Sequence, residues 1–186
     1  MPARAVFLDR DKTLIDDPGY LDHPDGVRLL PGVAEGLRRL KEAGYRLVVV
    51  TNQSAIARGK VTIDRLETIH AELRRQLTAA GVELDAIYYC PYHPDGTVPP
   101  YNREHEERKP APGMLLRAAR EMDLNLSKSW MVGDRLRDIQ AGRRAGCKTV
   151  LVRSDSTEPA KEFVGDAEPN FETDGLLAAA EMILHT

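Results

Sequence analysis

Short apolar runs alternate with amphipathic segments along the chain, and this alternation constrains the fold more than any other feature of its 186 residues. Each run is short, as in Ala-Val-Phe-Leu at 5–8, which is typical of a strand buried on both faces of a sheet. The segments between the runs repeat apolar residues every three or four positions, as one face of a helix does. We therefore expect strands at 5–8, 47–50, 86–89, 130–132 and 149–152, and helices at 32–44, 63–77, 112–122, 136–145 and 176–184.

Strands that alternate with helices predict an α/β fold, a doubly wound parallel sheet with helices on both faces. The length suits one domain, 1–186, and is short for two. Insertions after the first and third strands are short, so no large cap domain is expected. One extended loop, at about 90–110, is rich in proline, and loops of this length inside a compact domain are usually functional or disordered.

Charge and composition exclude several classes of partner. The chain has 26 basic and 29 acidic residues, so we expect neither a nucleic-acid surface nor a polybasic membrane patch. No apolar run approaches the roughly 20 residues of a membrane span, and Met1 leads almost directly into the first strand, without room for a signal peptide. Cys90 and Cys147 are far apart and suit a reducing compartment. These features predict a cytoplasmic monomer that binds a small molecule.

Polar motifs stand at the ends of the expected strands. Asp-Arg-Asp-Lys-Thr at 9–13 follows the first strand, Thr-Asn-Gln-Ser at 51–54 follows the second, and Gly-Asp-Arg-Leu-Arg-Asp at 133–138 follows the fourth. Arg-Lys-Pro at 108–110 comes shortly before a helix. Each motif alone is explained by a solvated turn or by the start of a helix. Because the carboxyl ends of parallel strands meet at one edge of the sheet, the motifs together predict a single site.

The order and spacing of these motifs resemble the haloacid-dehalogenase (HAD) superfamily, whose signature is D-x-D-x-T, a Ser or Thr after the second strand, a Lys, and G-D-x-x-x-D. The resemblance implies a phosphatase in which Asp9 attacks phosphorus and forms an aspartyl-phosphate. Asp11 would protonate the leaving alcohol and then activate water. Thr51 and Lys109 would hold the transferring phosphoryl group.

The resemblance also implies a magnesium ion, bound by Asp134, the Asp9 carboxylate and the Asp11 main-chain carbonyl, with Asp138 orienting these ligands. The chemistry explains the need for cations. A carboxylate that approaches a phosphate is repelled, by on the order of 4 kcal/mol for each pair of unit charges at about 4 Å and an effective dielectric near 20. Magnesium and a lysine remove that barrier.

The strings Tyr-Tyr-Cys-Pro at 88–91 and Arg-Lys-Pro-Ala-Pro-Gly-Met at 108–114 are similar to one branch of the superfamily, the D-glycero-D-manno-heptose 1,7-bisphosphate 7-phosphatases and the neighbouring histidinol-phosphate phosphatases. This resemblance implies a sugar bisphosphate as substrate. Arg58 and Arg103 are further candidates for a second phosphate. The substrate contacts it implies are Asp17, Gly19, Tyr20, Asn52, Gln53, Ser54, Arg108 and Arg135.

The chain departs from this branch at two places. Lys12 stands where the branch usually has Gly, a residue that permits unusual dihedral angles. Its side chain either points to solvent or adds charge near the phosphate. The branch also holds a structural zinc ion in its long loop by C-x-H and C-x-C, and those positions read Cys90, Tyr92, His105 and Glu107 here. We expect that the zinc is lost; a substitute site would combine Cys90, His93, His105 and Glu107.

Two other functions remain open at this point. Histidinol-phosphate phosphatase is the alternative within enzymes, and it would require carboxylates to receive an amine. The arginines near the motifs favour a second phosphate instead. A non-catalytic phosphate-binding protein is the alternative of another class. The presence of Asp9, Asp11, Thr51, Lys109 and Asp134 argues against it.

Overall fold

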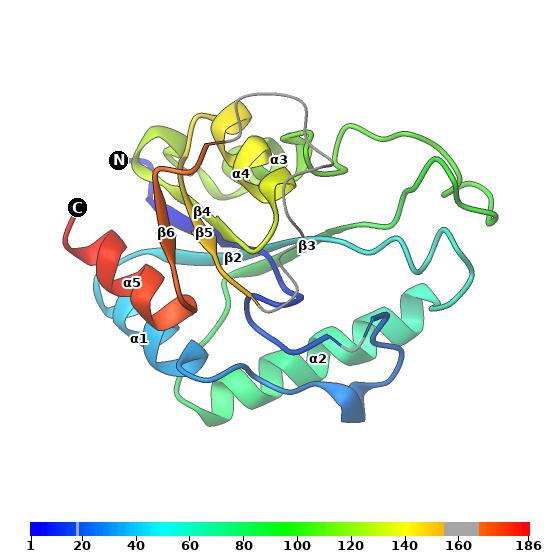
Figure 1. Cartoon of the computed structure of the whole chain (residues 1–186), viewed down its shortest axis with the longest axis horizontal. Coiled ribbons are helices and arrows are strands. Elements are labelled where there is room, and N and C mark those ends of the chain that lie inside the picture. The colour runs from blue at the N-terminus through cyan, green and yellow to red at the C-terminus, as the bar shows by residue number, and fades with distance from the viewer. Residues whose placement is uncertain (18, 155–167) are drawn as a thin grey trace.

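The computed structural model describes residues 1–17, 19–154 and 168–186. Its centre is a six-stranded sheet, parallel throughout, in the order β3-β2-β1-β4-β5-β6 (Figure 1). The chain winds outwards from β1 in both directions, so the order of strands reverses between β1 and β4. The strands are β1 Ala5–Leu8, β2 Arg46–Asn52, β3 Ala86–Cys90, β4 Trp130–Gly133, β5 Lys148–Val152 and β6 Phe171–Thr173.

Helices cover both faces of the sheet, as expected for a doubly wound fold. Figure 1 shows α1, α2 and α5 below the sheet and α3 and α4 above it. No large cap domain is present among the described residues. The helices are α1 Val33–Glu42, α2 Ile63–Ala79, α3 Gly113–Met122, α4 Leu136–Ala145 and α5 Leu176–Leu184, and the short 3-10 helices are η1 Pro24–Gly26 and η2 Leu126–Lys128.

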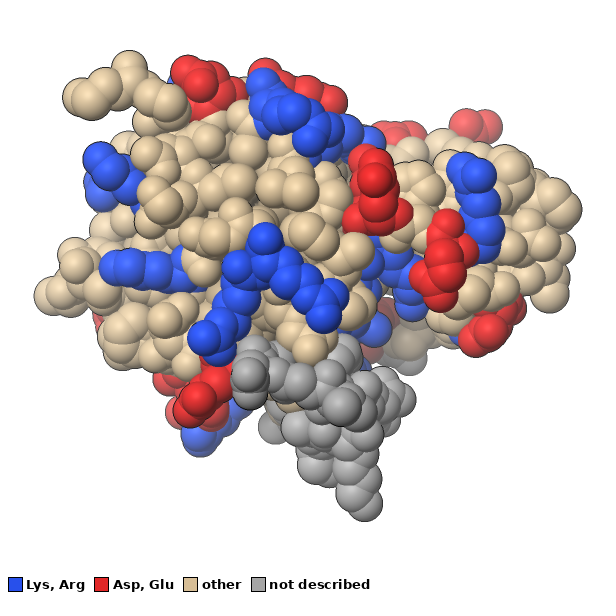
Figure 2. All heavy atoms as spheres, turned by 90° about the horizontal axis from the view of Figure 1, so that it is seen from above, with Lys and Arg blue, Asp and Glu red and all other residues tan. Residues whose placement is uncertain are grey.

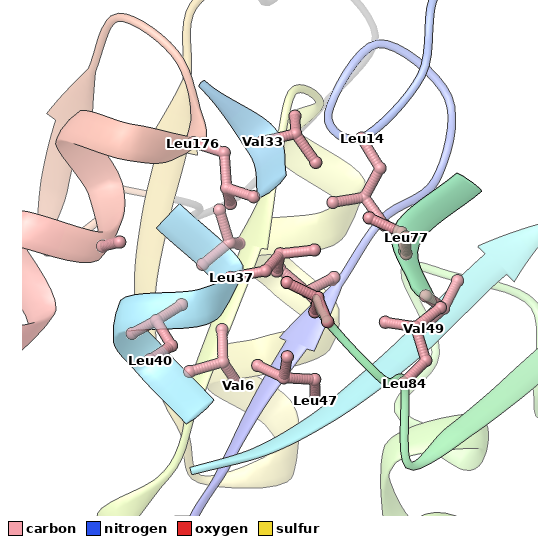
Figure 3. Packing of buried hydrophobic residues seen from close by; sticks show 14 of the residues in the cluster. Val6, Leu14, Val33, Leu37, Leu40, Leu47, Val49, Leu77, Leu84 and Leu176 are labelled. Atoms are coloured by element: carbon pink, nitrogen blue, oxygen red, sulfur yellow. The ribbon is translucent and has the colours of Figure 1, made fainter. Parts of the chain in front are cut away.

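The central strands are buried on both faces because their side chains alternate. In β1, Val6 packs into the core shared with α1, α2 and α5, whereas Phe7 packs into the core shared with α3 and α4. On α1, Leu37 and Leu40 point at Leu47 and Val6 in the sheet (Figure 3). Burying one such leucine contributes about 1.5–3 kcal/mol, so these contacts fix the helices against the sheet.

The expected strands and helices are confirmed, with one omission. Strand β6, Phe171–Thr173, is absent from the sequence-based prediction, because a three-residue edge strand with the exposed Glu172 at its centre contains no continuous apolar run. Thr62 caps the start of α2, since its Oγ1 accepts a hydrogen bond from the Arg65 backbone N–H at 3.2 Å.

The segment between β3 and α3, residues 91–112, contains neither helix nor strand. Backbone hydrogen bonds nevertheless hold it: Thr97 N and Val98 N donate to Ala57 O at 2.7 and 3.0 Å. The loop leaves the sheet beside β3 and returns to place Lys109 before α3 (Figure 1). The end of this surface loop therefore carries a predicted site residue, Lys109.

Lys and Arg side chains are scattered among uncharged and acidic ones on the face that α3 and α4 cover (Figure 2). No helix in the described part of the chain is long and apolar enough to cross a membrane.

Candidate active site

The predicted site residues meet where the strand order reverses. Asp9 directly follows β1 and Asp134 directly follows β4, its neighbour in the sheet. The Asp9 backbone N–H donates to Val132 O at 2.9 Å and so fixes the two strand ends together. This crevice at the carboxyl ends of the strands is where open α/β sheets bind ligands.

Lys109 lies inside this crevice and is only 1% exposed. Its Nζ donates to Asp9 Oδ1 at 2.8 Å and to the Val50 carbonyl at 2.7 Å, and it lies 2.6 Å from Asp138 Oδ1. Burial pulls the pKa of Lys109 down, but the carboxylates of Asp138 and Asp9 outweigh burial and raise it above 10.5. The lysine is therefore a permanent positive charge against Asp9.

Three buried carboxylates, those of Asp9, Asp134 and Asp138, bring oxygens within 4.8 Å of one another. If all three carboxylates are ionised, they and the Lys109 ammonium group give this buried cluster a net charge of −2. Burial, and then repulsion by Asp9 and Asp138, raises the pKa of Asp134 from 3.8 to about 8. A hard divalent cation with oxygen ligands would relieve this repulsion, so the donor set fits magnesium.

Asp138 is held by both of its oxygens. Oδ1 contacts Lys109, and Oδ2 accepts the backbone N–H of Arg135 at 3.0 Å, at the start of α4. A Cβ on Gly133 would collide with this carboxylate. The glycine before Asp134 is therefore required because the Asp138 side chain packs directly over it.

Arg10 is 1% exposed and holds the Asp11 carboxylate by hydrogen bonds. Its Nε and Nη2 donate to the two Asp11 oxygens at 2.8 and 3.1 Å, and Nη2 also donates to Gln53 Oε1 at 3.1 Å. Its Nη1 lies 3.2 Å from Nε2 of the buried His70. Since arginine only donates, that nitrogen accepts. Burial and the charge of Arg10 lower the pKa of His70 to about 3, so the ring is neutral.

Residues 51–54 connect β2 to the site through side-chain amides. Gln53 Nε2 donates to Asp11 Oδ2 at 3.0 Å and to Thr51 Oγ1 at 2.9 Å. Asn52 exchanges hydrogen bonds with the backbone of Lys109, at 2.9 and 3.0 Å. The second motif thus holds both Asp11 and Lys109 in place.

A cavity of about 290 Å³ opens over these groups. Most of the predicted site residues line it, whereas Thr51 and Arg108 do not, and Arg108 donates to the Tyr92 carbonyl at 3.2 Å. Arg10 and Arg137 line it without having been predicted; each occupies a variable position of a quoted motif, which was the available signal. The lining is Asp9, Arg10, Asp11, Lys12, Asp17, Gly19, Tyr20, Leu21, Asn52, Gln53, Ser54, Ala55, Lys109, Asp134, Arg135 and Arg137.

Lys12 adopts a left-handed backbone conformation, with φ of 60°. This conformation explains why glycine is the usual residue at the position. The Lys12 Nζ donates to Asp16 Oδ1 at 2.7 Å, so its charge is engaged at the rim of the cavity. Among the predicted substrate contacts, Tyr20 lies against the Lys60 ammonium, whose Nζ is 4.0 Å from the ring centroid, and the neighbouring Pro18 lies outside the described residues.

The four positions considered for a substitute zinc site do not form a ligand cluster among the described residues. His93 Nε2 lies 3.2 Å from an Arg58 nitrogen, and Glu107 accepts from Arg117 at 2.6 Å. His105 instead stacks on Tyr92, with ring centroids 4.1 Å apart and planes 4° from parallel. An aromatic stack thus joins the two arms of the loop.

Known proteins share this architecture. The model of the HAD-hydrolase-like family matches residues 107–179. A solved structure, D,D-heptose 1,7-bisphosphate phosphatase from B. bronchiseptica complexed with magnesium and phosphate, superposes with a TM-score of 0.84 at 34% identity, over 98% of both chains. The fold and the carboxylate–lysine site at its switch point define a HAD-type hydrolase.

Curated relatives narrow the class. The chain is 46% identical over 151 residues to D-glycero-beta-D-manno-heptose-1,7-bisphosphate 7-phosphatase of Yersinia pestis, covering 81% of this chain and 80% of the relative. It is 41% identical to the D-glycero-D-manno-heptose-1,7-bisphosphate 7-phosphatase of Thermosynechococcus vestitus, over 98% of this chain and 96% of the relative. The chain belongs to the D-glycero-D-manno-heptose-1,7-bisphosphate 7-phosphatase family of HAD hydrolases and is a phosphoric monoester hydrolase.

Proposed function

We propose that the protein removes the 7-phosphate of D-glycero-D-manno-heptose 1,7-bisphosphate, in a magnesium-dependent reaction that passes through an aspartyl-phosphate on Asp9. The observation that carries the proposal is the buried contact of Lys109 with Asp9 beside Asp134, in the lining of a cavity of about 290 Å³. The relatives named above supply the choice of substrate.

Asp9 is the nucleophile. Lys109 Nζ donates to its Oδ1, and Oδ2 has no hydrogen-bond donor among the described residues. Oδ2 therefore attacks phosphorus, forming the P–O bond of the aspartyl-phosphate as the bond to the sugar oxygen breaks. Lys109 and the Thr51 hydroxyl bind the transferred oxygens.

Asp11 is the general acid and then the general base. Its carboxyl group gives a proton to the departing sugar oxygen and later takes one from the water that hydrolyses the aspartyl-phosphate. Three hydrogen bonds from Arg10 and Gln53 hold this carboxyl group, so that it is positioned before the substrate binds.

Asp9 and Asp134, with the Asp11 main-chain carbonyl, are the residues that would hold magnesium, and Asp138 orients them through the start of α4. The ion supplies charge neutralisation for the phosphoryl oxygens. The cluster's net negative charge supports this assignment, because an anionic substrate would otherwise be repelled.

The test is phosphate release from the heptose bisphosphate with and without magnesium, with histidinol phosphate measured alongside. We expect turnover of the heptose substrate only with magnesium, and phosphorylated protein after acid quenching. Hydrolysis of histidinol phosphate alone would keep the mechanism and overturn the substrate.

Asp9→Asn is the matched loss-of-function variant, since it keeps the shape of the side chain and removes its charge. Asp22→Asn is the control, because Asp22 is exposed and lies outside the cavity lining. Turnover by Asp9→Asn close to that of Asp22→Asn would show that Asp9 is not the nucleophile.

A further inference from the structure

The cations that line the active-site cavity differ in how they are paired. Five of them line it, and four lie within 4.0 Å of a carboxylate. Each of these four therefore has a carboxylate partner within the protein itself. The pairs are Arg10 with Asp11 at 2.8 Å, Lys12 with Asp16 at 2.7 Å, Lys109 with Asp9 at 2.8 Å and Arg135 with Asp134 at 3.5 Å.

The fifth cation is Arg137, in the first turn of α4. Within 1–17, 19–154 and 168–186, its guanidinium makes no hydrogen bond and no ion pair, although the side chain is half-buried. The acid whose charge it feels is Asp138, and that carboxylate already contacts Lys109 at 2.6 Å. Arg137 is thus an uncompensated positive charge facing the substrate cavity.

A second cation lies near Arg137. Burial lowers the pKa of the Arg108 guanidinium, and the positive charge of Arg137 lowers it further. Arg108 donates only to a carbonyl, that of Tyr92, and forms no ion pair among the described residues. The positive charges of Arg108 and Arg137 repel each other, and a bound anion would relieve that repulsion.

We propose that Arg137 determines specificity by binding the second phosphate of a sugar bisphosphate, the one that is not hydrolysed. The inference rests on the proposed function and adds a residue to it. A phosphate carries close to two negative charges and offers several acceptor oxygens, which suits the donor fork of a guanidinium. A sugar monophosphate or an amine-bearing phosphate ester has no group that would compensate Arg137.

The experiment compares kcat/KM for a bisphosphate and for the corresponding monophosphate, in the wild type and in Arg137→Gln. The pairs are heptose 1,7-bisphosphate with heptose 7-phosphate, and fructose 1,6-bisphosphate with fructose 6-phosphate. A charged hydrogen bond contributes enough to binding that the preference for bisphosphate should fall about tenfold or more, mainly through KM. Hydrolysis of the monophosphates should change less than about twofold.

Two further variants distinguish a phosphate contact from a general effect on α4. Arg137→Lys retains the charge but not the fork, so it should restore part of the preference. Arg143→Gln changes an exposed arginine of the same helix that donates to the Glu168 carbonyl, and it should behave as the wild type does. A preference unchanged in Arg137→Gln, or an equal loss on both members of a pair, would overturn the inference.

The outcomes also separate the inference from the proposed function. Hydrolysis of the heptose bisphosphate with an unchanged preference in Arg137→Gln rejects the role of Arg137 and keeps the function. Loss of preference on the fructose pair, without hydrolysis of either heptose substrate, keeps the role of Arg137 and rejects the heptose. Absence of hydrolysis of both pairs by the wild type rejects both.

Discussion

Lys109 and Asp138 are almost completely buried at the carboxyl edge of the sheet, whereas the loop that leads to Lys109 leaves Arg103 and Glu104 exposed. At this edge, Lys109 contacts two carboxylates and a backbone carbonyl, and Asp138 contacts Lys109 and the Arg135 backbone N–H. In the loop, turns, an aromatic stack and a few backbone hydrogen bonds define the path.

This difference determines which substitutions each region can tolerate. A buried charge needs an opposite charge or hydrogen bonds at its own position. The carboxyl edge of the sheet therefore tolerates few substitutions. A surface loop contains few buried charges. Its residues can therefore be substituted while its end still places Lys109 in the site. In this loop the Tyr92–His105 ring stack, rather than a buried ion pair, joins residues far apart along the loop.

The strongest challenge to this contrast is Lys109→Met. Removing the ammonium group leaves the carboxylates of Asp9 and Asp138 buried without a cation, which should cost about 3–5 kcal/mol of stability. Phosphatase activity should be lost as well. Denaturant unfolding measures the first effect and phosphate release the second. Lys128→Met, at an exposed lysine, is the control and should stay within about 0.5 kcal/mol of the wild type.

Magnesium binding should depend on pH with a defined sign. The pKa of Asp134 is raised from 3.8 to about 8, so the folded protein keeps a proton that the unfolded chain loses. Without metal, the stability due to this group therefore falls as the pH rises through that window. Magnesium replaces the proton, so its stabilisation should grow over the same window and reach about 2.7 kcal/mol at a concentration of about 100 Kd.

Thermal unfolding at about pH 5 and about pH 8, with and without magnesium, measures this effect. Asp134→Asn should abolish the magnesium-dependent shift at both pH values. A shift of equal size at the two pH values in the wild type would mean that Asp134 is not the group that magnesium deprotonates.

The sequence predicts the edge far better than the loop. Asp9 and Asp134 follow apolar runs that become neighbouring strands, and parallel strands place their carboxyl ends together whatever their exact bounds. The roles assigned to these residues remain predictions. Arg10 and Arg137 were not predicted as site residues. Their place in the cavity depends on burial and on the pairing of neighbouring charges, and neither burial nor pairing can be read from spacing along the chain.

The loop illustrates the opposite limit. Its prolines predict an extended segment, and 91–112 indeed lacks helix and strand. Nothing in the spacing of Tyr92 and His105 indicates that their rings stack, because the contact joins residues from two arms of an irregular path. Likewise, β6 is not predicted because its three residues show no strand pattern of their own, and its strand conformation depends on pairing with β5.

A smaller effect is expected from His105→Ala, which removes one ring of the stack. Such pairs contribute about 0.5–1.5 kcal/mol beyond their buried area. Stability should fall by roughly that amount, whereas turnover of a simple aryl phosphate should stay within about twofold of the wild type. The control is His23→Ala, at an exposed histidine.

The same loop makes an independent prediction about zinc. We expect the purified protein to contain no stoichiometric zinc by elemental analysis, and a zinc-specific chelator to leave its unfolding temperature unchanged. Zinc at one equivalent, lost together with stability in His105→Ala, would show that the loop still depends on a metal.

The smallest effect is expected at Lys12, where the edge and the solvent meet. Lys12→Gly relieves a left-handed conformation, which costs about 1 kcal/mol for a residue with a Cβ. The substitution also raises the conformational entropy of the unfolded chain and removes an exposed ion pair with Asp16. Each of these effects lowers the stability by up to about 1 kcal/mol. The net change in stability should therefore be below about 1 kcal/mol.

Because Asp16 already binds the Lys12 ammonium group, KM for the bisphosphate should change less than about twofold in Lys12→Gly, against about tenfold for Arg137→Gln. A rise in KM as large as that of Arg137→Gln would mean that Lys12 leaves Asp16 to bind the substrate.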